Sequence, residues 1–267
     1  MKKAIGIFDS GVGGLTVYKA IRAAFPEEDL IYFGDTARVP YGPKSPNTII
    51  EYSIQNSRFL LQQGIKTLIV ACNTSSAVAI PALQQLTDIP IIGVIEPGAE
   101  QAARMTKTKR IGIVGTEGTV RSGAYTKAIH KLIPDAQVFP VACPLFVALV
   151  EEGWQDHEIA KSIAKEYLQA FEGYNIDTLV LGCTHYPLLR NVIQEVIGHD
   201  VTLVDSADAI TEYLARLLPP DSDGTKGKDC YYVSDNEAKF AQIAERILND
   251  NVGNLARVRL FESWFKD

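Results

Sequence analysis

Short apolar runs of strand length alternate along the chain with stretches that have the periodicity of a helix. The apolar runs predict strands at residues 3–8, 30–33, 67–70, 91–95, 110–114, 178–181, 201–205 and 230–233. Helices are predicted up to about Ala24, from about Gly98, and at 47–63, 75–86, 187–197, 207–218 and 238–248, the last with Asp235 as its N-cap. All-apolar strands that lead into helices are typical of buried parallel strands in βα units. The pattern therefore predicts an α/β fold with mainly parallel sheets.

One strand and the turn after it occur twice. The stretch TLIVACNT (67–74) returns 111 positions later as TLVLGCTH (178–185), and residues 6–10 are echoed more weakly at 112–116. The segments 36–46, rich in Pro and Gly, and 219–228, which is polar, are predicted to be a loop and a linker. We infer two βαβ-rich lobes of like topology, related as a pseudo-twofold pair, with the active site in the cleft between them.

The composition is that of an ordinary globular protein. Of the 267 residues, 46% are hydrophobic and 22% are charged, which is enough for a substantial core. The formal net charge of −6 argues against nucleic acid or an anionic membrane as a partner. No apolar run approaches the roughly 18 residues of a membrane helix, and no signal peptide is recognised before Asp9. We expect a cytoplasmic protein that binds neither nucleic acid nor membrane.

The duplicated turn places Cys72 and Cys183 at the carboxyl ends of equivalent strands. In open α/β sheets, this edge is where ligands bind. Inverting a carbon centre by proton transfer needs a base on one face and an acid on the other. A thiol and a thiolate can exchange these two roles. Two lobes that close on one cleft would present Cys72 and Cys183 from opposite sides, with the α-carbon of a substrate between them.

Further polar residues stand beside these turns. Asp9 ends the first strand and His185 lies two residues after Cys183, so each is placed to orient or deprotonate a thiol. Small donors that are fit to hold carboxylates follow the predicted strands: Ser10, Asn73, Thr74, Thr116, Thr119 and Thr184. For Asp35, a helix N-cap and a role in the site are both open.

The cysteines and the glycine-rich turn also have alternative interpretations. Cysteine is often a small buried hydrophobe, which is our interpretation of Cys143 and Cys230, whereas the duplicated context argues against it for the other two cysteines. A disulfide would need an oxidising compartment, and a zinc site lacks a Cys-x-x-Cys pair. The glycine-rich turn 11–14 imitates a dinucleotide-binding fingerprint, but Thr16 occupies the position of the third glycine.

Five motifs together resemble glutamate racemases of the cofactor-independent aspartate/glutamate racemase superfamily. They are DSGVGGL (9–15), PYG (40–42), ACNT (71–74), VEEG (150–153) and GCTHYP (182–187). The resemblance implies two α/β lobes, residues 1–97 plus 208–267 and residues 98–207. It also implies interconversion of L- and D-glutamate for peptidoglycan synthesis, with no cofactor and no metal.

The same resemblance implies roles for individual residues. Cys72 and Cys183 would be the two acid/base thiols, with Asp9, Glu151 and His185 assisting. Glu151 is preferred over its neighbour Glu152 on this ground alone. The turns Asp9-Ser10, Tyr41-Gly42, Asn73-Thr74 and Thr184-His185 would contact the substrate.

Two other functions stay open at this point. One is racemisation of aspartate, which an assay with both enantiomeric pairs would distinguish. The other is a non-catalytic amino-acid binding module, since two lobes with hydroxyl-lined turns can also hold a ligand. A binding module has no need of paired thiols, which favours the enzyme. A homodimer is the default expectation for the assembly.

Overall fold

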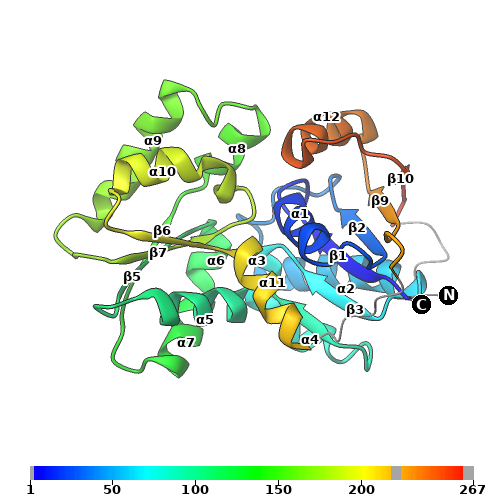
Figure 1. Cartoon of the computed structure of the whole chain (residues 1–267), viewed down its shortest axis with the longest axis horizontal. Coiled ribbons are helices and arrows are strands. Elements are labelled where there is room, and N and C mark those ends of the chain that lie inside the picture. Colours follow the sequence, from blue (N-terminus) through cyan, green and yellow to red (C-terminus); the bar gives the residue numbers. More distant parts are fainter. Residues whose placement is uncertain (1–2, 218–223, 261–267) are drawn as a thin grey trace.

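The computed structural model describes residues 3–217 and 224–260 and has the expected α/β architecture (Figure 1). In this part of the chain, ten strands form two sheets in which every pairing is parallel. The first sheet contains β1 (Ile5–Asp9), β2 (Leu30–Gly34), β3 (Thr67–Val70), β4 (Ile91–Gly93), β9 (Asp229–Val233) and β10 (Leu255–Arg257). The second contains β5 (Arg110–Gly115), β6 (Gln137–Ala142), β7 (Thr178–Gly182) and β8 (Thr202–Asp205).

The two sheets repeat one strand order. The first runs β10-β9-β2-β1-β3-β4 and the second β6-β5-β7-β8, so each has its first strand between its second and third strands. The chain therefore reverses its direction of winding next to β1 in one sheet and next to β5 in the other. Such switch points open a crevice at the carboxyl ends of the strands. Both duplicated turns begin there, after β3 and β7.

The central strands are apolar throughout because both faces of each sheet are covered. On β1, Ile5 and Ile7 pack into one buried cluster, and Phe8 packs into another on the opposite face. On β7, Leu179 and Val180 likewise enter different clusters. Side chains alternate between the faces of a strand, so a strand that is buried on both sides needs apolar residues at every position.

The helices cover these faces (Figure 1). Around the first sheet lie α1 (Leu15–Ala24), α2 (Pro46–Gln62), α3 (Asn73–Val78), α4 (Ile80–Leu83) and α12 (Glu237–Leu248). The second sheet carries α6 (Glu117–Ser122), α7 (Ala124–Leu132), α8 (Leu145–Glu151), α9 (Glu158–Leu168) and α10 (Arg190–Ile197). The chain crosses between the sheets through α5 (Ile95–Met105) and α11 (Ser206–Leu217). Two 3₁₀ turns, η1 (Gln169–Phe171) and η2 (Tyr186–Leu189), complete the elements.

Proline accounts for three differences from the sequence prediction. The helix expected at 75–86 is divided into α3 and α4, and Pro81 stands in the first turn of α4. Proline has no N–H and its ring clashes with the preceding turn, so it begins a helix more readily than it continues one. For the same reason Pro187 lies in η2, and only Arg190–Ile197 is α-helical. The helix expected from Gly98 already begins at Ile95, because Pro97 is tolerated in its first turn.

The predicted N-cap at Asp235 was wrong. Asn236 caps α12, and its side chain accepts a hydrogen bond from the backbone N–H of Lys239 at 3.1 Å. The backbone of Asn236 is left-handed, with φ of 48°, a conformation that asparagine tolerates well. The carboxylate of Asp235 instead pairs with Arg257 of β10. This strand was not predicted, and the linker predicted at 219–228 lies partly outside the described residues.

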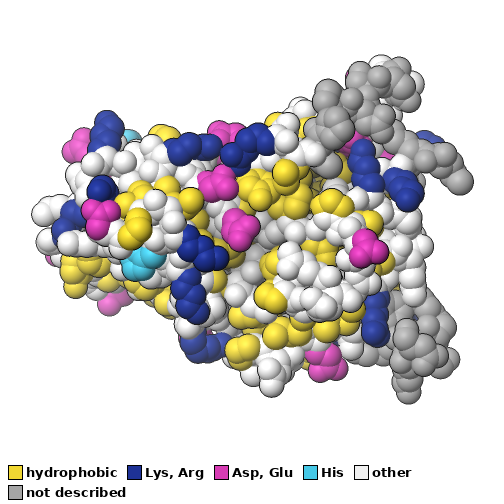
Figure 2. All heavy atoms as spheres, turned by 90° about the horizontal axis from the view of Figure 1, so that it is seen from below, with side chains coloured by type: hydrophobic (Ala, Val, Ile, Leu, Met, Phe, Trp, Pro, Cys, Tyr) yellow, Lys and Arg dark blue, Asp and Glu magenta, His cyan; other side chains and the backbone are white. Residues whose placement is uncertain are grey.

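Charged side chains do not gather into one field on the face seen in Figure 2. Lys and Arg side chains are interspersed there with Asp, Glu and apolar side chains. Within residues 3–217 and 224–260, no helix combines the length and the apolar character that crossing a bilayer requires.

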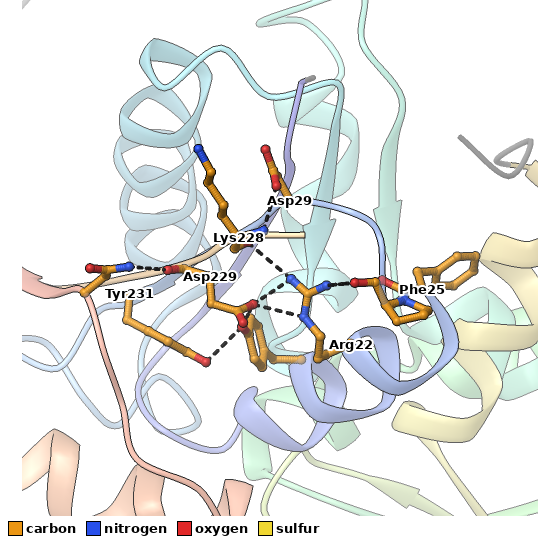
Figure 3. Close-up of polar contacts among 9 residues, drawn as sticks. Arg22, Phe25, Asp29, Lys228, Asp229 and Tyr231 are labelled. Atoms are coloured by element: carbon orange, nitrogen blue, oxygen red, sulfur yellow. Dashed lines mark hydrogen bonds and ion pairs between the residues drawn. The ribbon is translucent and has the colours of Figure 1, made fainter. Parts of the chain in front are cut away.

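The segment after the second sheet returns to the first sheet and is held by a polar cluster. β9 pairs with β2 along its length. The Asp229 side chain of β9 accepts hydrogen bonds from Arg22 Nε at 3.0 Å and from the Tyr18 hydroxyl, both on α1 (Figure 3). Arg22 also reaches the backbone oxygen of Lys228 at 3.2 Å. Residues more than 200 positions apart in sequence are thereby fixed to each other.

Replacing Asp229 with Ala removes the acceptor that Tyr18 and Arg22 share. Hydrogen bonds to charged groups contribute about 1.5–3 kcal/mol each, so we expect the free energy of unfolding to fall by about 2 kcal/mol. Urea unfolding followed by circular dichroism measures the change. The control is Asp135→Ala, since Asp135 pairs with Lys109 while both side chains are more than half exposed, at 68% and 51%. Equal shifts of the midpoint in the two variants would contradict the assignment.

Candidate active site

The predicted site residues converge where the carboxyl ends of the two sheets meet. Asp9 is the last residue of β1, and Cys72 follows β3 as the N-cap of α3. In the second sheet, Thr116 follows β5 as the N-cap of α6, and Cys183 follows β7. Each cysteine therefore stands one or two residues beyond the third strand of its sheet. Contacts of Thr74 with Thr116 and of Asp9 with Thr184 join these turns.

Cys72 lies in an apolar niche lined by Tyr41 and Ile49, and its residue is 5% exposed. Its Sγ lies 3.6 Å from the hydroxyl oxygen of Ser10. Burial and then the charge of Asp9 raise the pKa of the Cys72 thiol to about 11, and hydrogen bonds from Ser10 and from Ser75 oppose this only in part. Cys72 is thus a neutral thiol at pH 7, able to give up a proton.

Cys183 has a different partner. It is also 5% exposed, but its Sγ lies 3.8 Å from His185 Nδ1, and His185 Nε2 lies 3.2 Å from Glu151 Oε1. Burial lowers the pKa of His185, yet the Cys183 thiol and Glu151 outweigh it and raise the pKa to about 10. Burial also acts against the charge of Glu151, but the hydrogen bond from His185 prevails and lowers its pKa. A positively charged imidazolium therefore lies beside the sulfur atom of Cys183.

Asp9 joins the two halves of the site. Its buried carboxyl accepts a hydrogen bond from the Gly11 N–H at 2.9 Å, and Thr184 Oγ1 of the other sheet lies 3.4 Å from its second oxygen. Burial raises the pKa of Asp9, and its charge in turn raises the pKa of Cys72. One carboxyl group is therefore coupled to Cys72 and to the residue that follows Cys183.

The glycine-rich turn allows this close approach. A Cβ atom on Gly13 would lie 2.4 Å from His185 Nδ1 and 2.5 Å from Thr184 Oγ1. Thr16, the residue that breaks the dinucleotide fingerprint, donates its hydroxyl to the backbone oxygen of Thr184 at 2.9 Å. The glycine-rich turn therefore packs the loop that contains Cys183, Thr184 and His185 against the first sheet.

Three threonine hydroxyls form a second link between the sheets. Thr74 Oγ1 lies 2.8 Å from Thr116 Oγ1 and 3.3 Å from Thr119 Oγ1, and the last two are 3.0 Å apart. A hydroxyl can both donate and accept, so this group can reorient its protons toward a carboxylate.

The loop over residues 36–46 is held by Asp35. Its buried carboxylate accepts from Arg38 at 2.6 Å, from Ser234 at 2.8 Å and from the Tyr41 hydroxyl. Asp35 caps no helix, and its role is to anchor this loop. The Tyr41 hydroxyl is fully engaged in this network, whereas Gly42 packs so closely on Thr116 that a Cβ would lie 2.9 Å away.

Two cavities lie where this loop faces the second sheet. One of about 300 Å³ is lined by residues that include Pro43, Thr116 and Glu151. The other, about 170 Å³, is lined by residues that include Gly11 and Glu151. Both border the carboxylate that holds His185. A larger cavity of about 590 Å³ lies between α9 and α10 and contains none of the predicted site residues.

The other two cysteines lie elsewhere. Cys143 is fully buried in the core of the second sheet, and Cys230 lies half-buried on β9. All four cysteines are free thiols. Over the described part of the chain, no group of three or more His, Cys, Asp or Glu side chains is arranged to hold a metal ion.

Sequence reasoning missed three residues that contact the site. Ser75 lowers the pKa of Cys72, chiefly through its backbone N–H, and the hydroxyls of Tyr125 and Ser206 both reach Asn73. Ser206 follows the carboxyl end of β8, so its position at a strand end was a usable signal. Tyr125 gave no signal, because it lies within α7 and reaches Asn73 only across the two sheets.

Comparison with known proteins gives consistent results. Residues 5–214 match the family model described as Asp/Glu/Hydantoin racemase. A glutamate racemase from Geobacter metallireducens is 54% identical over 264 residues, which is 97% of each chain. The crystal structure of glutamate racemase isoform RacE1 from Bacillus anthracis superposes with a TM-score of 0.93 at 39% identity, covering 96% of this chain and 97% of that one. A glutamate racemase from Francisella tularensis, solved in complex with D-glutamate, gives a TM-score of 0.91 at 38% identity, covering 97% and 98%.

The contact between His185 and Glu151 predicts how the pKa of His185 changes when Glu151 is replaced. Replacing Glu151 with Gln removes the negative charge at Nε2, so we expect the pKa of His185 to fall from about 10 toward its ordinary value. A raised histidine pKa stabilises the fold below the unfolded-state pKa of about 6.5, and this stability is lost as the pH rises through about 10. The free energy of unfolding of Glu151→Gln should therefore lie below that of the wild type at pH 7, and the difference should be smaller at pH 10.

Histidine NMR titration measures the pKa, with the resonance assigned by its absence in His185→Gln. The matched control is Glu152→Gln, which removes an exposed carboxylate one residue further along the chain. An unchanged titration in Glu151→Gln, or an equal change in both variants, would contradict the pairing.

Proposed function

The chain belongs to the Asp/Glu/Hydantoin racemase family, and we propose that it is a glutamate racemase that inverts the α-carbon with two cysteines. The observation that carries this proposal is the pairing of Cys72 and Cys183. They stand at equivalent strand ends of two sheets with one strand order, and Asp9 couples them through Thr184. A binding protein would have no use for two thiols in this arrangement.

The reaction needs one thiolate and one thiol in each turnover. The thiolate removes the α-proton from one face of the amino acid, and the electron pair of the broken C–H bond is delocalised into the α-carboxylate. The thiol then delivers its own proton to the opposite face. The cysteines have exchanged protonation states at the end, so the next turnover runs in the opposite direction or follows proton exchange with water.

The surroundings assign the starting roles. We assign the first proton abstraction to Cys183, whose sulfur atom faces the His185 imidazolium held by Glu151. Cys72 has hydroxyl partners and the nearby charge of Asp9, so it begins as the thiol. His185 can also return its Nδ1 proton to Cys183 when that cysteine acts as an acid. Burial raises the pKa of the Asp9 carboxyl group, so Asp9 is suited to return a proton to Cys72 in the same way.

The substrate's carboxylates need donors in a chain whose net charge is −6. We assign this task to the backbone of the loop residues Tyr41-Gly42 and to residues at the turns after the strands: Ser10, Asn73, Thr74, Thr116, Thr119 and Thr184. Hydrogen bonds to the α-carboxylate stabilise the charge that develops there on deprotonation, most strongly where water is excluded. Because both cysteines are 5% exposed, the turns must separate to admit the amino acid and then close on it.

Several expectations stay predictions. They are the lobe boundaries 1–97 plus 208–267 and 98–207, action without cofactor or metal, supply of D-glutamate for peptidoglycan, a cytoplasmic location, and a homodimer.

Replacing either Cys72 or Cys183 with Ser should abolish racemisation of glutamate in both directions. A serine hydroxyl is far too weak an acid to replace a thiol, and one general acid or base contributes about 10²–10⁴-fold to the rate. Circular dichroism of L- and D-glutamate follows the reaction, with Cys230→Ser as the control that should keep full activity. Racemisation at wild-type rates in both single variants would refute the two-thiol mechanism.

The wild-type protein in D₂O should incorporate deuterium at the α-carbon of each enantiomer of glutamate as it is inverted. Proton abstraction requires this, since a thiol exchanges its proton with solvent. Proton NMR of the product measures it, and L- and D-aspartate serve as the comparison substrates. Inversion without deuterium uptake would exclude a proton-transfer route, and faster turnover of aspartate would reassign the substrate.

A further inference from the structure

The side-chain amide of Asn73 is hydrogen-bonded at its oxygen atom, whereas its nitrogen atom has no partner among the described residues. It follows Cys72 directly, in the first turn of α3, and is 2% exposed. Its Oδ1 accepts a hydrogen bond from the Tyr125 hydroxyl at 2.7 Å and another from the Ser206 hydroxyl at 3.2 Å. Its Nδ2 is buried and has no acceptor among the residues that the structure describes.

An unpartnered amide N–H group in a protein interior is uncommon and costly. The two donors on Oδ1 occupy both lone pairs of the amide oxygen, so they also set the direction of the NH₂ group. Asn73 stands between Cys72 and Thr74, whose hydroxyl takes part in the threonine link. An anionic acceptor that enters between these turns would satisfy the free N–H groups.

The two donors come from parts of the chain far from the first cysteine turn. Tyr125 lies on α7, beside the second sheet, and Ser206 is the first residue of α11, where the chain leaves that sheet (Figure 1). The Asn73 amide is therefore held from the opposite side of the site.

The Tyr125 ring packs closely against two glycines. A Cβ on Gly98 of α5 would lie 3.1 Å from one ring edge, and a Cβ on Gly182 of β7 would lie 3.0 Å from the other. Burial raises the pKa of Tyr125, so its hydroxyl stays protonated and remains a donor. Any larger residue at Gly98 or Gly182 would displace the ring from Asn73.

We propose that Tyr125 and Ser206 are positioning residues, which hold the Asn73 amide so that its NH₂ group donates to a carboxylate of the bound amino acid. Neither residue touches the substrate. They act by preventing the amide from rotating, since a rotated amide would present its oxygen to the substrate's negative charge. The inference rests on the proposed function, because it assigns a carboxylate substrate to this site.

The test uses kcat and KM for glutamate in Tyr125→Phe, Ser206→Ala, Asn73→Ala and Asn73→Ala/Tyr125→Phe. We expect Tyr125→Phe to raise KM about tenfold for both enantiomers and to change kcat less than about threefold, the size of effect that follows from losing one hydrogen bond. Ser206→Ala should act in the same direction. In the double variant, the KM should equal that of Asn73→Ala alone, because the tyrosine hydroxyl has no amide left to position.

The matched control is Tyr231→Phe, which removes a buried tyrosine hydroxyl that donates to the Tyr18 hydroxyl of α1. It should leave both kinetic constants unchanged. Thermal unfolding of every variant separates loss of fold from loss of positioning, and Ser206→Ala carries the test if Tyr125→Phe does not fold. An unchanged KM in both single variants, or a further multiplication of KM in the double variant, would overturn the proposal.

A second readout is independent of turnover. In ligand-free wild-type protein, the Asn73 side-chain NH₂ should give two distinct proton resonances in ¹⁵N NMR spectra, assigned by their absence in Asn73→Ala. They should shift and broaden in Tyr125→Phe and stay unchanged in Tyr231→Phe. If wild-type protein does not racemise glutamate, the proposed function fails, and these resonances still decide whether Tyr125 orients the amide.

Discussion

The contact between Asp9 and Thr184 is the constraint on which the site depends. It joins the end of β1 to the turn after β7, so it brings the carboxyl edges of two separate sheets together. A buried carboxyl group is unfavourable unless it is hydrogen-bonded, and Asp9 meets this need with the Gly11 N–H and Thr184. The approach is close enough to require glycine at position 13. This contact holds the turn that carries Cys183 against the end of β1.

The two thiols are equivalent in the fold but not in their electrostatics. Cys183 faces a histidine held by Glu151, whereas Cys72 faces a serine hydroxyl and the charge of Asp9. The two sulfur atoms therefore face different neighbouring charges, an imidazolium at Cys183 and a carboxylate at Cys72.

Residues next to the thiols also make contacts that cross between the two sheets. Two of the residues that would touch the substrate, Thr74 and Asn73, are held by groups from the second sheet and its helices. Thr116 meets Thr74, and Tyr125 meets Asn73.

The sequence by itself determined the α/β class, the two like lobes and the turns that carry the chemistry. This was possible because strands buried on both faces must be apolar throughout, and because the duplicated TLIVACNT and TLVLGCTH stretches mark equivalent strand ends. Local rules failed where prolines divided helices, at the cap of α12, and for the short strand β10. The role of Asp35, the orientation of the Asn73 amide and the distinction between the two thiols were decided only by the tertiary structure. Each depends on hydrogen bonds between residues far apart in sequence, and no local pattern of hydrophobic and polar positions encodes which distant hydroxyl or carboxylate a side chain will meet.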